Sequence, residues 1–207
     1  MPDDIDDRLS CRTQDGFATP PPSGVRRRRL LGERPRKEIR ARVIRVNQAG
    51  EYGAVRIYEG QMVVLKHKAC AAVLRAMTEN EKTHLATFND LLVKKRVRPT
   101  ILQPLWHILG FTLGASTALL GEKAAMACTV AIEEVIEGHY TRQLYMLDED
   151  EEGDRELLKV IRQCREDERE HRAIGLTHGA TQHPASPVLS TLIKAASRLA
   201  IWLSERV

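Results

Sequence analysis

Two short stretches of similar sequence decide the fold: Glu79-Asn80-Glu81-Lys82-Thr83-His84-Leu85-Ala86 and Glu166-Asp167-Glu168-Arg169-Glu170-His171-Arg172-Ala173. In each, a glutamate stands three residues before a histidine, and a second glutamate and an alanine occupy matching flanking positions. Residues three apart share one face of an α-helix, so each stretch presents a carboxylate and an imidazole together. One such match arises easily by chance in a charged helix, whereas two extended matches indicate an internal repeat.

The repeat extends to a glutamate upstream of each stretch. Glu51 is followed by a tyrosine after seven residues and by a glutamine after ten, and Glu133 is followed by the same residue types at the same spacings. Each half therefore has one helix with a single glutamate and one with Glu-x-x-His, as in ferritin-like carboxylate proteins. We predict an all-α, ferritin-like four-helix bundle with six metal ligands: Glu51, Glu81, His84, Glu133, Glu168 and His171.

The remaining sequence is also expected to be helical from residue 37 onward, because apolar residues recur at intervals of three and four. Start and stop signals place helices at about 37–67, 70–96, 115–147, 151–178 and 187–206. The last of these is amphipathic and is additional to the bundle. We expect residues 36–207 to form one di-iron domain and residues 1–35, with their acidic, proline-rich and arginine runs, to form a disordered tail.

Residues 101–121 (ILQPLWHILGFTLGASTALLG) carry no formal charge and are long enough to resemble a membrane span. Pro104, Gly110 and Gly114 are expected to interrupt a helix here. We therefore interpret the stretch as an apolar crossover that lies in or near a membrane surface, with a spanning helix as the weaker alternative. The C-terminal helix either packs on the bundle or lies in a membrane interface.

The ligand types suit two iron ions, because four carboxylates offset most of the charge and imidazoles complete a mixed oxygen and nitrogen set. Open positions can then bind oxygen. The same ligands fit manganese, whereas zinc is disfavoured because no cysteine ligand set is present. Glu137, one turn after Glu133, is the second choice for its role. The cysteines at 11, 70, 128 and 164 are interpreted as ordinary reduced thiols.

Five further residues are candidates for supporting the ligands. A metal-bound histidine usually donates its other N–H to a carboxylate or an amide oxygen. Asp167 and Asn80 directly precede two predicted ligands, and each could reach the histidine of the opposite half. Tyr58, Tyr140 and His139 are either supporting residues or ordinary core residues.

Several functions are compatible with a di-iron site: oxygen-dependent hydroxylation or desaturation, peroxide removal, and iron storage. The apolar crossover and the C-terminal helix favour a lipid-soluble substrate, whereas a ferritin- or rubrerythrin-like protein is the alternative. Nucleic-acid binding is not expected, because the net charge of +4 and pI of about 9.0 are modest.

Four segments resemble the demethoxyubiquinone hydroxylases of ubiquinone biosynthesis: RVNQAGEYGAVRIYEGQM (45–62), EKTHLATFNDL (81–91), RVRPTILQPLWHILGFTLGASTALLGEKAAMACTVAIEE (96–134) and REHRAIGLTH (169–178). The similarity runs from about residue 40 to the C-terminal IWLSERV. It implies a di-iron monooxygenase that hydroxylates the ring of a polyprenylated 6-methoxy-3-methyl-1,4-benzoquinol before a final O-methylation. The iron ligands of that family fall on the same six residues.

The resemblance also implies partners. It suggests NADH as reductant, O2 as co-substrate and a lipid-binding accessory protein in a biosynthetic complex. No Gly-x-Gly-x-x-Gly loop follows a predicted strand, so a dinucleotide-binding fold is not expected. The expected location is the cytoplasmic face of a bacterial inner membrane, as a peripheral protein.

Overall fold

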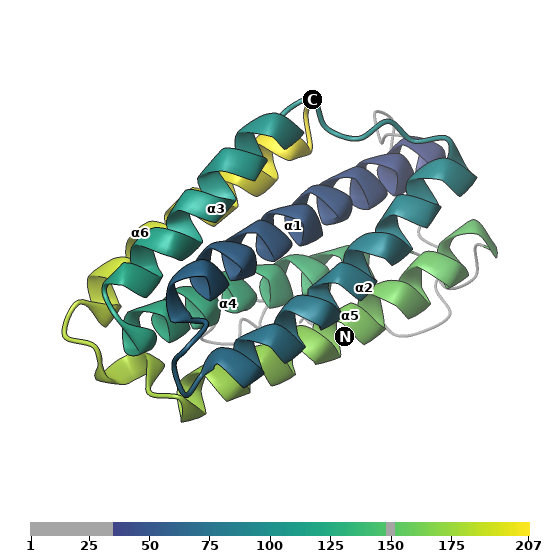
Figure 1. The fold of residues 1–207 in the computed structure, drawn as a ribbon. Helices are drawn as coiled ribbons and strands as arrows, with labels where there is room; N and C mark the ends of the chain where they lie inside the picture. The colour runs from purple at the N-terminus through teal and green to yellow at the C-terminus, as the bar shows by residue number, and fades with distance from the viewer. Residues whose placement is uncertain (1–34, 148–151) are drawn as a thin grey trace, which may run out of the picture. The chain divides into compact units, whose positions relative to one another are not determined.

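Four helices carry the repeat found in the sequence. In the computed structural model, α1 (Arg36–Leu65) and α2 (Ala71–Lys95) form the first half, and α4 (Glu122–Met146) and α5 (Glu152–Thr177) form the second (Figure 1). The structure describes residues 35–147 and 152–207, without the side chains of 152–154. Residues 1–34 of the predicted tail lie outside the described residues. The described residues form six α-helices and contain no strand, which confirms the all-α prediction.

Two large apolar clusters pack the bundle, one on each side of its middle, and a third, smaller cluster packs against the last helix. One cluster includes Ile44, Phe88 and Ile161. The other includes Leu74 and Met126. All five side chains are buried, and burying one large apolar side chain contributes about 1.5–3 kcal/mol to stability. The middle of the bundle is therefore closed off from solvent at both ends by tightly packed side chains.

Helix α3 (Gln103–Leu119) corrects the prediction for residues 101–121. Pro104 lies in the first turn, where a helix does not need its missing N–H. Gly114 faces α1, where a Cβ atom would overlap the carbonyl oxygen of Ile57. The residues expected to interrupt a helix therefore begin it and allow close packing. Gly121, with φ of 112°, separates α3 from α4, so the single helix predicted at 115–147 was wrong.

The last helix, α6 (Ser186–Ser204), follows a short 3-10 turn at Ala180–Gln182 and packs against α4. Ile193 is buried in this contact, and Lys194 pairs with Glu134 of α4 at 2.8 Å. The indole N–H of Trp106 in α3 donates to the hydroxyl of Ser204, at 3.0 Å. Among the helices that the structure describes, none is both long and apolar enough to cross a bilayer.

Candidate metal centre

The structure brings the six predicted ligands together in the middle of the bundle. Single glutamates extend from α1 and α4, and the two Glu-x-x-His pairs extend from α2 and α5. Each of the six residues is only 0–4% exposed. Four carboxyl groups in so small a buried volume are costly unless cations or protons offset their charge. The six residues are Glu51, Glu81, His84, Glu133, Glu168 and His171.

These side chains form two overlapping groups with metal-ligand spacing. One atom each from Glu51, Glu81, His84 and Glu168 lies within 4.8 Å of the others. The same holds for Glu133 and His171 together with Glu81 and Glu168. The two glutamates of the Glu-x-x-His helices belong to both groups. This arrangement suits two neighbouring cations that share two carboxylates.

Unpaired polar atoms mark the same centre. Nδ1 of His84 lies 3.5 Å from carboxylate oxygens of both Glu51 and Glu168, and Nδ1 of His171 lies 3.0 Å from Glu81. Neither Nδ1 atom has a hydrogen-bond partner among the described residues, and each of the four glutamates has at least one such oxygen. Buried polar atoms are seldom left unpaired. The donor set therefore fits metal ions.

The electrostatics of the centre favour protons or cations. Burial raises the pKa of Glu81, Glu133 and Glu168, and the neighbouring carboxylates raise it further. Burial lowers the pKa of His84, but the nearby carboxylates of Glu168 and Glu51 outweigh this effect and raise it to about 11. Metal binding here must therefore release protons, so it strengthens with pH.

Nε2 of each ligand histidine contacts a residue from the other half of the repeat, as predicted from the sequence. Nε2 of His84 lies 2.9 Å from Oδ2 of Asp167, whose other oxygen accepts a hydrogen bond from Gln163 at 2.9 Å. Nε2 of His171 lies 3.4 Å from the amide of Asn80. Rotating this amide by half a turn presents its oxygen to the ring N–H. Both contacts orient Nδ1 toward the centre.

Two tyrosines also cross between the halves. Tyr58 of α1 donates to Oε1 of Glu133 at 2.6 Å, and Tyr140 of α4 donates to Oε1 of Glu51. Burial, followed by the charge of the nearby glutamates, raises the pKa of both phenols well above 10, so they remain donors. Each tyrosine occupies one oxygen of its glutamate and leaves Oε2 unpaired for the centre.

Two other candidates lie apart from the centre. Among the described residues, His139 forms no hydrogen bond to the six; its ring lies 2.6 Å from Gln143, and burial lowers its pKa to about 4. The second-choice ligand, Glu137, pairs with Arg172 at 2.7 Å and with Arg169 at 3.5 Å. These arginines hold its carboxylate outside the two ligand groups, so its role as an outer-shell or alternating ligand stays a prediction.

One residue of this region was missed by the sequence reasoning. Cys164 is buried, and its sulfur lies within 4.8 Å of ligand atoms of Glu51 and His84. Its position, four residues before Glu168, already placed it on the same face of α5. That spacing was the signal that could have identified it.

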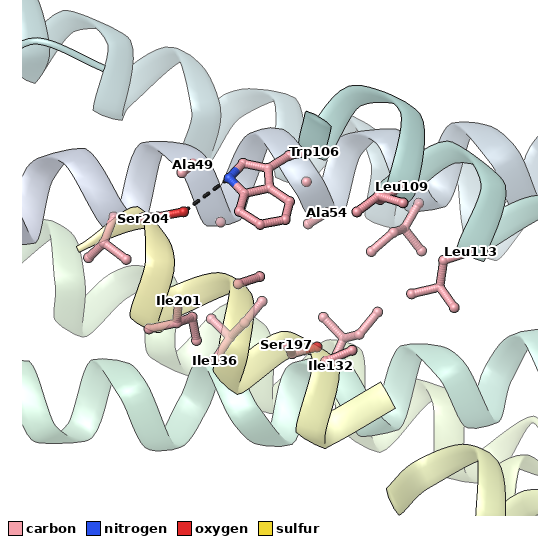
Figure 2. Close-up of a pocket in the computed structure, with 17 residues that line it drawn as sticks. Ala49, Ala54, Trp106, Leu109, Leu113, Ile132, Ile136, Ser197, Ile201 and Ser204 are labelled. Carbon is pink, nitrogen blue, oxygen red and sulfur yellow. Dashed lines mark hydrogen bonds between the residues drawn. The ribbon is translucent and has the colours of Figure 1, made fainter. Parts of the chain in front are cut away.

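An apolar pocket of about 170 Å³ lies among α1, α3, α4 and α6 (Figure 2). Its wall includes Gly50 and Ile132, which directly precede Glu51 and Glu133. Trp106 and Ser204 lie on the wall as well, joined by their hydrogen bond. No charged side chain lines this pocket. It therefore suits an apolar ring in contact with the helices that carry two of the glutamates.

Comparison with known proteins agrees with this site. Residues 38–204 match the family described as "Ubiquinone biosynthesis protein COQ7". A 3-demethoxyubiquinol 3-hydroxylase of Rhodospirillum rubrum is 56% identical over 180 residues, which cover 86% of this chain and 84% of the relative. The NADPH-dependent 3-demethoxyubiquinone 3-hydroxylase, mitochondrial, of Homo sapiens is 54% identical over 167 residues, covering 80% and 77% of the two chains. The chain therefore belongs to the COQ7 family of ubiquinone biosynthesis proteins, which confirms the resemblance found in its sequence.

Proposed function

We propose that this protein is a 3-demethoxyubiquinol 3-hydroxylase, which uses O2 to add a hydroxyl group to the ring of a polyprenylated 6-methoxy-3-methyl-1,4-benzoquinol. One observation carries this proposal: the two helices that supply single glutamates to the buried carboxylate and imidazole cluster also line an apolar pocket of ring size. The names of its relatives agree with that reaction. A ferritin- or rubrerythrin-like function is less well supported, because neither iron storage nor peroxide removal needs such a pocket.

Two iron ions are the proposed cofactor. Glu51 and His84 would hold one ion, Glu133 and His171 the other, and Glu81 and Glu168 would contact both. Four carboxylates balance the charge of two divalent ions, and iron accepts mixed oxygen and nitrogen ligands. Bound iron would supply the redox chemistry with O2. The protein itself positions the ligands through the cross-half hydrogen bonds and excludes water with its apolar clusters.

The apolar pocket among α1, α3, α4 and α6 is the proposed position of the quinol ring. A cavity of about 150 Å³ lined by apolar side chains can hold benzene, so the 170 Å³ here is adequate for one substituted ring. A polyprenyl tail is much longer and must extend beyond the pocket. The glycines at 50, 53 and 110 keep the wall thin and apolar.

A membrane surface is the proposed source of this substrate. Helices α3 and α6, which form one side of the pocket, also expose large apolar side chains to the outside, including Ile108, Leu119, Leu192 and Leu199, each more than half exposed. Exposed apolar surface of this kind marks contact with lipid or with a protein partner. We infer peripheral attachment to the cytoplasmic face of a bacterial inner membrane, with a lipid-binding accessory protein as a further partner of the same helices.

The proposed reductant is a nicotinamide dinucleotide. NADH is the expected donor, and the name of the human relative specifies NADPH for that protein. The described residues contain no strand, so they provide no βαβ dinucleotide-binding unit. Electrons would reach the centre either through the quinone or from a separate reductase, and parallel assays with NADH and NADPH distinguish the donors.

The test is direct. Iron-loaded protein is incubated with a short-tail demethoxyquinone, reductant and isotopically labelled O2, and mass spectrometry should detect one labelled hydroxyl group on the ring. Glu168→Ala and Glu133→Ala should abolish this product. Glu170→Ala is the matched control, because Glu170 lies on α5 but is exposed, and it should retain activity. Product formation by both ligand variants, or label-free product, would contradict the proposal.

A further inference from the structure

Cys164 gives one half of the centre a donor that the other half lacks. It lies on α5, one turn before Glu168, and only 3% of it is exposed. Met77 holds the corresponding position on α2, one turn before Glu81, and its sulfur contacts the hydroxyl of Tyr58 at 3.9 Å. The two halves therefore present a thiol and a thioether at equivalent places. Only the thiol can lose a proton and bind a divalent cation strongly.

Cys164 is not an isolated cysteine. Its sulfur, a carboxylate oxygen of Glu51 and a ring nitrogen of His84 all lie within 4.8 Å of one another. Oε2 of Glu51 and Nδ1 of His84 have no hydrogen-bond partner among the described residues, although these residues are only 1% and 4% exposed. The thiol therefore lies close to two side chains that each carry an unpaired buried atom. A cation placed there could bind all three side chains after modest rotamer changes.

The donor types select the ion. One thiolate, one imidazole and one carboxylate make a three-residue zinc set that leaves a fourth tetrahedral position for water. Zn²⁺ also binds most nitrogen, oxygen and sulfur sites more tightly than Fe²⁺ does. A thiolate strengthens this preference, because it is a softer ligand than a carboxylate.

We propose that Glu51, His84 and Cys164 form a site for a thiophilic divalent cation, Zn²⁺ in the first place, that overlaps one of the two iron positions. Binding forms a zinc–sulfur bond, and the thiol proton passes to solvent, so no oxidant or reductant is needed. Occupation by zinc excludes iron from the position at His84. This competition with iron rests on the proposed function, whereas the zinc site itself rests only on the three side chains.

Cadmium is a suitable probe, because a thiolate–cadmium bond has an ultraviolet charge-transfer band that carboxylate and imidazole ligands lack. Metal-free wild-type protein is titrated with Cd²⁺ and compared with the Cys164→Ser and Cys164→Ala variants. Circular dichroism of both variants shows whether either substitution disturbs folding. Cys128→Ser is the matched control: Cys128 is buried in an apolar cluster and belongs to none of the three ligand groups. The thiols of Cys11 and Cys70 are present in all four proteins and contribute equally to each.

The wild type and Cys128→Ser should show a band that grows to one equivalent of Cd²⁺ and is lost in both Cys164 variants. Zn²⁺ added first should suppress the band. An undiminished band in either folded Cys164 variant, or a wild type without the band, would overturn the proposal. Iron uptake and quinone hydroxylation are measured separately. A cysteine-dependent band in a protein that binds no iron would refute the proposed function alone, and hydroxylation without the band would refute this inference alone.

Discussion

Replacing Asp167 by alanine should weaken metal binding without unfolding the bundle. The Asp167 carboxylate lies 2.9 Å from Nε2 of His84 and is itself held by Gln163. Such an outer contact fixes the ring and typically contributes 10–100-fold to metal affinity, which corresponds to about 1.4–2.7 kcal/mol. The side chain is 21% exposed, so its removal leaves only a small, hydrated gap. We expect a loss in this range, concentrated in the binding step that involves His84.

The same geometry predicts an order of effects. Asn80 is neutral and lies 3.4 Å from Nε2 of His171, so Asn80→Ala should cost less than Asp167→Ala. Asp167→Asn, which keeps an acceptor oxygen, should fall between Asp167→Ala and the wild type. Glu166→Ala is the control, because Glu166 is exposed and pairs with Arg165 and Arg169.

An anaerobic competition titration with a coloured Fe(II) chelator measures these affinities. Cobalt(II) absorption gives a second readout of the ligand field, which a purely structural defect would not change in the same order. Unchanged affinity in Asp167→Ala, or an equal loss in Glu166→Ala, would refute the idea that this carboxylate orients the histidine.

Three further changes test the electrostatics, the packing and the pocket. Three buried glutamates have higher pKa values in the folded chain than in the unfolded chain, so the folded state favours their protonated form. Their contribution to the free energy of unfolding is therefore complete below about pH 4 and is lost as the pH rises. Scanning calorimetry should therefore show the melting temperature of metal-free protein falling between pH 5 and pH 8, but iron-loaded protein should not show this fall; a flat metal-free profile would contradict this. Gly114→Ala should lower the free energy of unfolding by about 1–3 kcal/mol through overpacking against Ile57. Gly138→Ala, whose Cβ would meet only the Arg142 side chain at 3.8 Å, should raise it by about 0.5–1 kcal/mol in denaturant titrations. Gly53→Leu should fill the pocket and lower kcat/KM for the quinol about tenfold or more, with iron content unchanged; normal turnover would show that the ring binds elsewhere.

The metal ligands were easier to predict than the contacts around them, because their positions depend on short spacings within the sequence. A glutamate and a histidine three residues apart must share a helix face, and the repeat fixed Glu133 rather than Glu134 by spacing alone. Glu133 is buried in the structure, whereas Glu134 is exposed and pairs with Lys194. The contacts of Asp167 and Asn80 were predicted from their matching positions, each directly before a ligand glutamate.

Features that depend on contact between distant helices could not be obtained this way. Gly110 and Gly114 suggested interruption of a helix, but their effect depends on how closely α3 approaches α1. Glu137 shares a helix face with Glu133, and only the position of Arg172 on α5 decides that it points elsewhere. The pocket has the same origin, since its walls come from four helices that are separated in the chain.

The crossed hydrogen bonds also constrain how this fold can change over generations. Tyr58 and Asn80 orient ligands of the second half, and Tyr140 and Asp167 orient ligands of the first. If the two halves descend from one duplicated helix pair, neither copy could lose its tyrosine without harming the other copy's glutamate. Compensating substitutions should therefore occur between the halves rather than within them. The duplicated units have become mutually dependent, and neither could be exchanged or inherited as a separate working part.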